Sequence, residues 1–330
     1  MAAILPSNQP KDRFYKGGAQ IDALRSSGPS DSHQPEDWVA STTCCNGCAD
    51  SKIGTSTLPD GRLLADAITD EAEFWLGKEH IKRYGVDTKL LFKLLDAGQR
   101  LPVHAHPHVS WAKKHLGKEH GKAEAWYMLT GGEIHLGLKE HVPRDQLLDW
   151  VNTQNVDELL NRMHKISVQP HQTVYVPPGM LHAIGQGCLI VELQEPEDLS
   201  VLLEWKGFEI DGAKNGHLGL GFETALTAVD NTARSAQAME KLITGPTENG
   251  ATVVEESREY FRLDRKKIVG DGLLDAGFMI LVVLEGGMRL MAEGGSEVDI
   301  EKGSTVVVPY GDGEVMLEGN GDVLVARPPL

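Results

Sequence analysis

Short apolar runs separated by Gly and Pro fill residues 101–203, and this spacing constrains the fold more than any other feature of the chain. Runs such as EAWYMLTGGEIHLGL and QTVYVPPGMLHAIGQGCLIVELQ join strand-forming segments through turn residues. Such a texture is typical of an antiparallel β sandwich or barrel. One stretch within it, about residues 143–164, has apolar residues at helical spacing, and it predicts a helical insertion between barrel strands.

The rest of the chain predicts a second barrel behind a helical joint. Residues 61–77 and 221–243 have helical character, while KLLFKLLDAG reads as a buried strand. From about residue 251 the chain returns to strands and Gly-rich turns, and KGSTVVVP repeats PHQTVYVPPG in miniature. We therefore predict a mainly β protein with a larger domain over residues 1–245, which includes an N-terminal extension, and a C-terminal barrel over residues 246–330.

Charge and composition exclude several classes of partner. The formal net charge is −16, whereas binding to nucleic acid or to an anionic membrane requires a basic surface. The N-terminus lacks a signal-like apolar region, and no run approaches the roughly 20 apolar residues of a membrane span. We expect a cytoplasmic protein with a small-molecule substrate, and the oligomeric state stays open. The CxxC pair Cys45 and Cys48 has no second pair to complete a zinc site, so we interpret these residues as reduced thiols in a loop.

Four residues in the first domain have the character of metal ligands. His104 and His106 are two positions apart, so on a strand both imidazoles project from one face, about 7 Å apart. Glu124 begins a following strand, and His182 comes after the rigid turn PPG. Three imidazoles and one carboxylate suit zinc or another divalent transition metal. Most of the other histidines in the chain need no special explanation, but HxHP, GKxE and PPGxxHA in this order predict a metal site.

These motifs resemble a known enzyme family. PEDWVAST, LLFKLLDAGQRLPVHAHP, GKAEAWYML, VYVPPGMLHAIG and VELQEPEDLSVLLEW are similar to successive blocks of the class I mannose-6-phosphate isomerases, in particular their short two-cupin members. The resemblance spans roughly residues 12–330. It implies two cupin (jelly-roll) β-barrels with helical insertions, and it implies a zinc-dependent isomerisation of mannose 6-phosphate to fructose 6-phosphate. Because His217 is the last histidine, the C-terminal barrel cannot repeat the imidazole site.

Two positions depart from the family pattern. His104 stands where the family usually has Gln, which gives the three-His, one-Glu arrangement of cupins in general. The family also has an Arg four residues after an Asp, which acts on the substrate near the metal. Asp198 matches that Asp, but Leu202 occupies the position of the arginine. A neutral apolar side chain can neither bind phosphate nor stabilise an enediolate.

An aldose–ketose isomerase also needs a base within reach of the substrate. The resemblance points to Lys122, the lysine of GKxE, either as this base or as a ligand of substrate hydroxyls. Glu192 and Asp198 are the other candidates, since alternation places Glu192 and Gln194 on one side of their strand. Three further histidines could line the mouth of the site and rank below these: His108, His120 and His171.

The substrate remains the most open point. The densest basic run, SREYFRLDRKK, could bind a phosphate or could simply be a solvated surface; its cations are Arg258, Arg262, Arg265, Lys266 and Lys267. Without a phosphate site, the substrate could be an unphosphorylated sugar or another hydroxycarbonyl compound, handled by a specialised isomerase or epimerase. An iron-dependent cupin dioxygenase and a binding or regulatory cupin are the remaining alternatives.

Overall fold

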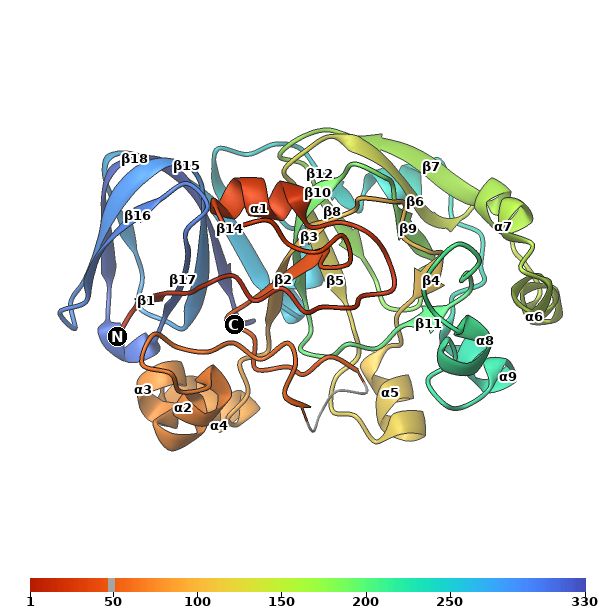
Figure 1. Ribbon diagram of the computed structural model, residues 1–330, viewed down its shortest axis with the longest axis horizontal. Coiled ribbons are helices and arrows are strands. Elements are labelled where there is room, and N and C mark those ends of the chain that lie inside the picture. The colour runs from red at the N-terminus through yellow and green to blue at the C-terminus, as the bar shows by residue number, and fades with distance from the viewer. Residues whose placement is uncertain (47–50) are drawn as a thin grey trace.

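The computed structural model describes residues 1–46 and 51–330, and its strands form two sheet systems that lie side by side (Figure 1). The first system holds a six-stranded sheet in the order β12-β8-β5-β10-β3-β2 and a five-stranded sheet in the order β11-β4-β9-β6-β7. Neighbouring strands in both sheets are antiparallel. The bounds are β2 Glu36–Val39, β3 Leu91–Asp96, β4 His104–Ala105, β5 Glu124–Met128, β6 Gly132–Leu138, β7 Met163–Val168, β8 Thr173–Val176, β9 His182–Ile184, β10 Leu189–Gln194, β11 Val201–Leu202 and β12 Ile243–Thr244.

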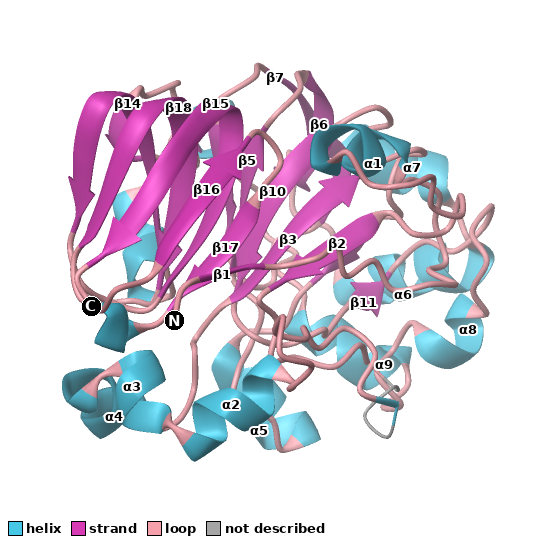
Figure 2. Cartoon of the chain, turned by 60° about the vertical axis from the view of Figure 1, so that its left-hand side comes forward, coloured by secondary structure: helices cyan, strands magenta, loops and turns pink. Residues whose placement is uncertain are grey.

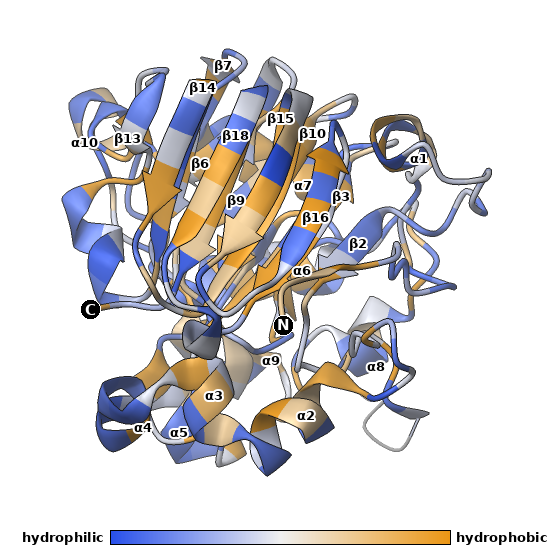
Figure 3. Ribbon diagram, turned by 90° about the vertical axis from the view of Figure 1, so that its left-hand side faces the viewer, coloured by the Kyte–Doolittle hydropathy of each residue, from blue (hydrophilic) through white to orange (hydrophobic). Residues whose placement is uncertain are grey.

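The second system is one seven-stranded sheet, in which β1-β17-β15-β18-β14-β13 follow one another and β16 pairs with β15. Its long strands are hydrophobic over much of their length, and β14 and β18 turn hydrophilic toward their upper ends in the view of Figure 3. The predicted mainly β, two-cupin architecture is confirmed. The bounds are β1 Ala3–Ile4, β13 Asn249–Ala251, β14 Arg262–Leu274, β15 Met279–Ala292, β16 Glu297–Glu301, β17 Thr305–Val308 and β18 Val315–Arg327.

The six-stranded sheet is covered on both faces, which explains why β5 is buried at every position. Along β5, Trp126 and Met128 point into the core of the first barrel. Ala125 and Tyr127 point the other way, into a core shared with the second barrel, where they meet residues such as Phe261. This alternation follows from the period of two in a strand. The same shared core fixes the two barrels against each other.

The predicted division at residues 245 and 246 stays a prediction, and one strand crosses it. β1 belongs to the N-terminal segment, yet it pairs with β17 of the second barrel, with Ala3 opposite Val307. The first residues of the chain therefore lie on the second barrel and not on the first.

Helices cover the ends of the strands (Figure 2). The helix predicted over residues 61–77 forms as two short helices, and the insertion predicted at about 143–164 also forms as a helix pair. Within the described ranges, no helix is long and apolar enough to cross a bilayer. The bounds are α1 Ala19–Arg25, α2 Leu64–Asp70, α3 Ala72–Leu76, α4 Lys78–Tyr84, α5 Val109–Leu116, α6 Arg144–Thr153, α7 Val156–Arg162, α8 Gly212–Asn215, α9 Phe222–Ala225, η2 Leu226–Ala228, α10 Ala236–Glu240, η3 Glu255–Glu259 and η4 Tyr310–Asp312.

The prediction of a helical joint over residues 221–243 is only partly correct, because an extended stretch separates η2 from α10. The amide of Asp230 donates to the carbonyl of Gly179, and the amide of Arg234 donates to that of Leu138. These hydrogen bonds to the first barrel provide partners for backbone amides of the stretch while it is extended. Tertiary contacts therefore override local helical propensity there.

Candidate metal centre and cavity

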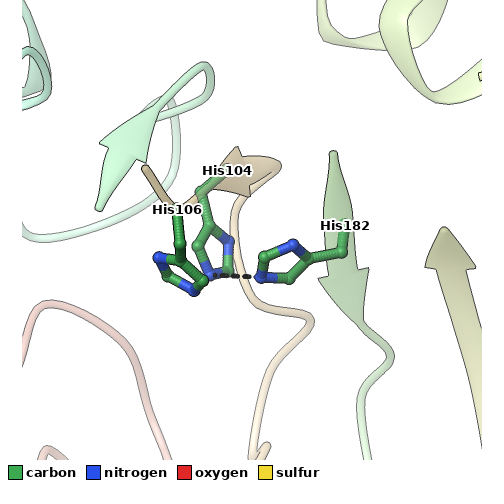
Figure 4. A group of neighbouring side chains, drawn as sticks. All are labelled: His104, His106 and His182. Atoms are coloured by element: carbon green, nitrogen blue, oxygen red, sulfur yellow. Dashed lines mark hydrogen bonds between the residues drawn. The ribbon is translucent and has the colours of Figure 1, made fainter. Parts of the chain in front are cut away.

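Three histidine side chains converge inside the first barrel (Figure 4). His104 on β4 is the register partner of His182 on β9, and His106 follows directly after β4. All three are buried, and their ligand atoms lie within 4.8 Å of one another. The Nε2 atoms of His104 and His182 are 3.0 Å apart. Neighbouring strands of one sheet thus bring together residues that are far apart in the sequence.

Backbone carbonyls fix which nitrogen of each ring carries the proton. Nδ1 of His104 lies 2.8 Å from the carbonyl oxygen of Pro102, and Nδ1 of His182 lies 2.9 Å from that of Met180. Nδ1 of His106 lies 2.7 Å from the carbonyl oxygen of Leu199. A carbonyl only accepts hydrogen bonds, so each Nδ1 must donate, and each Nε2 of a neutral ring keeps a lone pair. Hence all three lone pairs face the same point.

Glu124 closes the fourth side of this group. Its Oε2 lies 3.2 Å from Nε2 of His106, and its Oε1 lies 3.2 Å from Nε2 of His182. Trp126 Nε1 donates to Oε1 at 3.1 Å and fixes the carboxylate. Burial alone would raise the pKa of Glu124, but His106 and Lys122 hold it well below its usual value. Glu124 is therefore an anion at neutral pH.

His104 and His106 are neutral for the complementary reason. Burial lowers the pKa of His104 well below its usual value, and the neighbouring His182 adds to this. Burial and the ammonium of Lys122 lower the pKa of His106 to about 3. Neutral imidazoles and ionised carboxylates are the forms that bind metals.

The donor set fits a divalent metal ion. Among the described residues, the buried atoms His106 Nε2 and Glu124 Oε2 have no hydrogen-bond partner. Two lone pairs that face each other at 3.0 Å, as those of His104 and His182 do, repel unless a cation lies between them. Three neutral imidazoles and one carboxylate match the ligand types of zinc, iron, manganese, cobalt and nickel. His104, His106, Glu124 and His182 could hold such an ion.

A cavity of about 580 Å³ opens onto this group. His104 and Glu124 line it, whereas His106 and His182 are not among its lining residues. The three candidates for the catalytic base all line it as well, namely Lys122, Glu192 and Asp198. The volume is in the range of small-molecule sites. The structure therefore places the predicted catalytic residues in one cavity, while their roles stay predictions.

A row of alternating charges leads away from Glu124 along the cavity wall. Lys122 Nζ lies 3.4 Å from Glu124 and 4.0 Å from Glu192. Lys93 Nζ lies 3.2 Å from the same Glu192 and 3.8 Å from Glu36. Burial raises the pKa of Glu192, Lys93 opposes this shift, and the negative charge of Glu124 adds to it.

Arg13 continues the row. Its Nη2 lies 3.3 Å from Glu36 and 3.7 Å from Asp198, and the guanidinium carbon lies 5.9 Å from the ring centroid of Trp38. Burial alone would raise the pKa values of both carboxyls, but Arg13 and Lys93 hold that of Glu36 at about 2 and that of Asp198 well below its usual value. Asp198 is therefore a poor proton acceptor.

Sequence reasoning missed three of these residues, although two of them had a signal. Glu36 and Lys93 lie within the blocks PEDWVAST and LLFKLLDAG, and Lys93 has apolar neighbours on both sides, Leu91 and Phe92 before it and Leu94 and Leu95 after it. A lone charge in a buried strand is rare unless it is paired, and rarity of this kind marks a site. Arg13 lies in a polar N-terminal stretch and carried no such signal.

Several predicted contributors lie elsewhere. Gln194 and the three additional histidines do not line the cavity. His108 accepts from the Ser110 amide at the start of α5, and His120 pairs with Asp87. Cys45 is buried, and Cys48 lies outside the described residues.

The basic run at residues 258–267 does not line the cavity, which favours the second of its two interpretations, a solvated surface, over a phosphate site there. It lies on η3 and β14 of the second barrel, and none of its cations lines the cavity. Arg265 is bound to Asp322 through three hydrogen bonds. Lys267 pairs with Glu248 at 3.0 Å. The run stabilises the surface of the second barrel.

Comparisons with known proteins agree with this geometry. A family model described as "Mannose-6-phosphate isomerase, cupin domain" matches residues 251–328. A mannose-6-phosphate isomerase of Bacillus subtilis is 29% identical over 259 residues, which cover 75% of this chain and 78% of the relative. One of Streptococcus mutans is 39% identical over 112 residues, 33% of this chain and 34% of the relative.

Solved structures show the same fold over the whole chain. A crystal structure of mannose 6-phosphate isomerase from Bacillus subtilis has a TM-score of 0.75 and 22% identity, with 99% of each chain covered. The structure of a putative mannosephosphate isomerase from Archaeoglobus fulgidus has a TM-score of 0.76 and 19% identity, with 100% of this chain and 98% of that chain covered. The likeness extends over nearly the full length of both chains in each comparison.

Proposed function

The chain belongs to the type I mannose-6-phosphate isomerase family, and we propose that it converts mannose 6-phosphate to fructose 6-phosphate with a bound divalent metal. The observation that carries this proposal is the meeting of three imidazole lone pairs and one carboxylate beside a charged cavity. Zinc is the metal we propose, a sugar phosphate is the partner, and the cytoplasm is the location.

His104, His106, Glu124 and His182 hold the metal in this proposal. When bound there, the metal supplies Lewis-acid chemistry to the carbonyl and hydroxyl oxygens of the substrate. Glu124 is held by the Trp126 indole, and each imidazole is held by a backbone carbonyl. Partners of this kind keep metal ligands in one orientation.

The isomerisation moves a proton from C2 of the open-chain aldose to C1 and moves another from the oxygen on C2 to the oxygen on C1. Glu192 is the stronger candidate for the base, because its raised pKa makes the carboxylate a better proton acceptor. Lys122 lies between Glu192 and Glu124 and can donate to substrate oxygens. Asp198 is held ionised by Arg13 and Lys93, so it accepts hydrogen bonds from hydroxyls and takes no proton.

The alternating wall suits a polyhydroxylated substrate. Each sugar hydroxyl is both a donor and an acceptor, so a row of hydroxyls can bond to carboxylates and cations in turn. Leu202 adds no charge to this wall. It is apolar, pairs with His104 in the register of β11 and β4, and lines the cavity where the family has its arginine. The cation that the family places there must come from another part of the cavity.

An isomerisation assay of zinc-loaded protein on mannose 6-phosphate tests the proposal. The fructose 6-phosphate produced is measured by a coupled reaction, with free mannose assayed in parallel. His182→Ala should lower turnover by on the order of 10²-fold or more, because Lewis-acid catalysis contributes several kcal/mol. Absence of turnover in metal-saturated wild-type protein would sink the proposal. Oxygen uptake by iron-loaded protein would favour the dioxygenase alternative instead.

A further inference from the structure

Besides Lys93, three cations line the cavity without being part of its metal centre or of its candidate bases. Arg13 comes from the N-terminal segment, Lys118 lies just after α5, and Lys214 lies on α8. Lys118 and Lys214 are exposed, so they stand where the cavity meets solvent.

Backbone and side-chain contacts gather these cations near Asp198. The amide of Glu209, just before α8, donates to the carbonyl of Phe14 at 2.9 Å, and so places the segment that bears Lys214 beside Arg13. Lys118 pairs with Glu197 at 3.2 Å, one residue before the carboxylate that Arg13 contacts. The three cations are thus on one side of the cavity.

Donors remain free on this side. Of the guanidinium nitrogens of Arg13, only Nη2 has a hydrogen bond to a described residue, which is Glu36. Lys214 has no ion pair with any residue that the structure describes. Lys118 is paired with Glu197, so Lys214 adds a positive charge to this side without a paired carboxylate among the described residues.

We propose that Arg13, Lys118 and Lys214 bind the phosphate group of the substrate. The inference rests on the proposed function, which puts C1 and C2 of the sugar at Glu124 and His104. Arg13 is at the opposite end of the charged row from Glu124, and the phosphate is at the opposite end of the sugar from C1. A guanidinium presents paired N–H groups that match phosphate oxygens, and lysine ammonium groups add point charges. This site supplies a positive charge in the cavity, which Leu202 does not provide at the position of the family's arginine. The cations of residues 258–267 do not provide it either, because they do not line the cavity.

Binding of mannitol 6-phosphate, measured by calorimetry on zinc-loaded protein, tests the proposal without turnover. This sugar alcohol phosphate cannot isomerise. The double variant Lys118→Gln with Lys214→Gln changes only exposed side chains, so it should fold. Its affinity should fall at least about tenfold, since a charge-assisted hydrogen bond contributes about 1.5–3 kcal/mol and 1.4 kcal/mol is tenfold.

Lys114→Gln is the matched control, because Lys114 is exposed, lies on α5 and does not line the cavity. It should leave affinity unchanged. Arg13→Lys should retain more affinity than Arg13→Gln, since the charge remains while the paired donors are lost. If the double variant binds mannitol 6-phosphate as tightly as Lys114→Gln does, the phosphate site is refuted.

The isomerase assay keeps this inference separate from the proposed function. Turnover of mannose 6-phosphate with an unchanged KM in the double variant would overturn the phosphate site and leave the isomerase standing. Loss of mannitol 6-phosphate binding in the double variant, with no turnover in the wild type, would support the phosphate site and overturn the isomerase.

Discussion

Removing Lys93 should destabilise the protein far more than removing a lysine normally does. Its side chain is fully buried, its ammonium lies 3.2 Å from Glu192 and 3.8 Å from Glu36, and it lies 4.6 Å from the ring centroid of Trp38. Lys93→Met keeps the aliphatic length but leaves the two carboxylates with less positive charge. Loss of one partner from a buried pair costs about 3–5 kcal/mol, and we expect a cost in this range. That is a large part of a typical free energy of unfolding, about 5–15 kcal/mol.

The measurement is urea unfolding followed by tryptophan fluorescence, to which Trp38 contributes from beside Lys93. Lys165→Met is the matched control, because Lys165 and Glu133 form an ion pair at 2.9 Å with both side chains more than half exposed. An exposed pair contributes about 0–1 kcal/mol, so this control should unfold almost as the wild type does. Adding Glu192→Gln to Lys93→Met should recover at least about 1 kcal/mol, since it removes one of the stranded carboxylates.

The cost should also depend on pH in a defined direction. In the wild type, Lys93 and Arg13 hold the pKa of Glu36 at about 2, so this pair stabilises the fold above the unfolded pKa of about 4.3 and loses its effect only as pH falls toward 2. Without Lys93, the pKa of Glu192 rises further above its unfolded value, and the folded variant takes up a proton as pH falls. The difference between wild type and variant should therefore shrink from pH 7 to about pH 5. A cost below about 1 kcal/mol, or one that does not change with pH, would refute the reasoning.

Three further predictions concern the metal centre, the ion pair of His120 with Asp87, and the basic run. Bound zinc, measured by elemental analysis, should be lost in His182→Ala but retained in His104→Gln, since an amide oxygen can replace one imidazole; equal loss in both would contradict this. Burial opposes a charged His120, yet Asp87 and Glu195 raise its pKa to about 9. Its contribution to the free energy of unfolding, about 1 kcal/mol, should be full below pH 6.5 and vanish as pH rises through 9, as seen by comparing His120→Asn with wild type in urea unfolding at several pH values. Lys266→Gln should leave the kcat and KM for mannose 6-phosphate unchanged in the coupled assay, and a raised KM would contradict the placement of the basic run outside the cavity.

The grouping of the three histidines could be predicted because its determinants are local. HxH on a strand fixes two imidazoles by a period of two, and PPG before His182 fixes where the next strand begins. The structure adds what local rules do not contain, which is the register that sets His104 opposite His182. Strand register depends on the whole sheet and cannot be read from one segment.

The proposed phosphate contacts could not be predicted in the same way. The density of positive charge along the sequence indicated residues 258–267 as a possible phosphate site. A charged side chain binds a ligand, however, only where it lines a cavity and has free hydrogen-bond donors. The guanidinium of Arg265 already donates hydrogen bonds to Asp322. Arg13, in contrast, is a single arginine in a stretch whose sequence has no periodicity. Its place in the cavity follows from long-range contacts of the N-terminal segment.

The second barrel, which has no histidine, bears on the cavity through this N-terminal segment. β1 pairs with β17, and Arg25 Nη1 donates to the carbonyl of Gly303 and to Thr305 Oγ1, both at 2.7 Å. The same Arg25 lies 3.1 Å from Asp37, the residue next to the Glu36 that holds Arg13. Arg13 is thus in a stretch fixed to the second barrel at both ends, by β1 before it and by Arg25 after it. Because a charged side chain binds with less entropic cost when its backbone is already fixed, the second barrel would contribute to the proposed phosphate binding by Arg13 without touching the substrate.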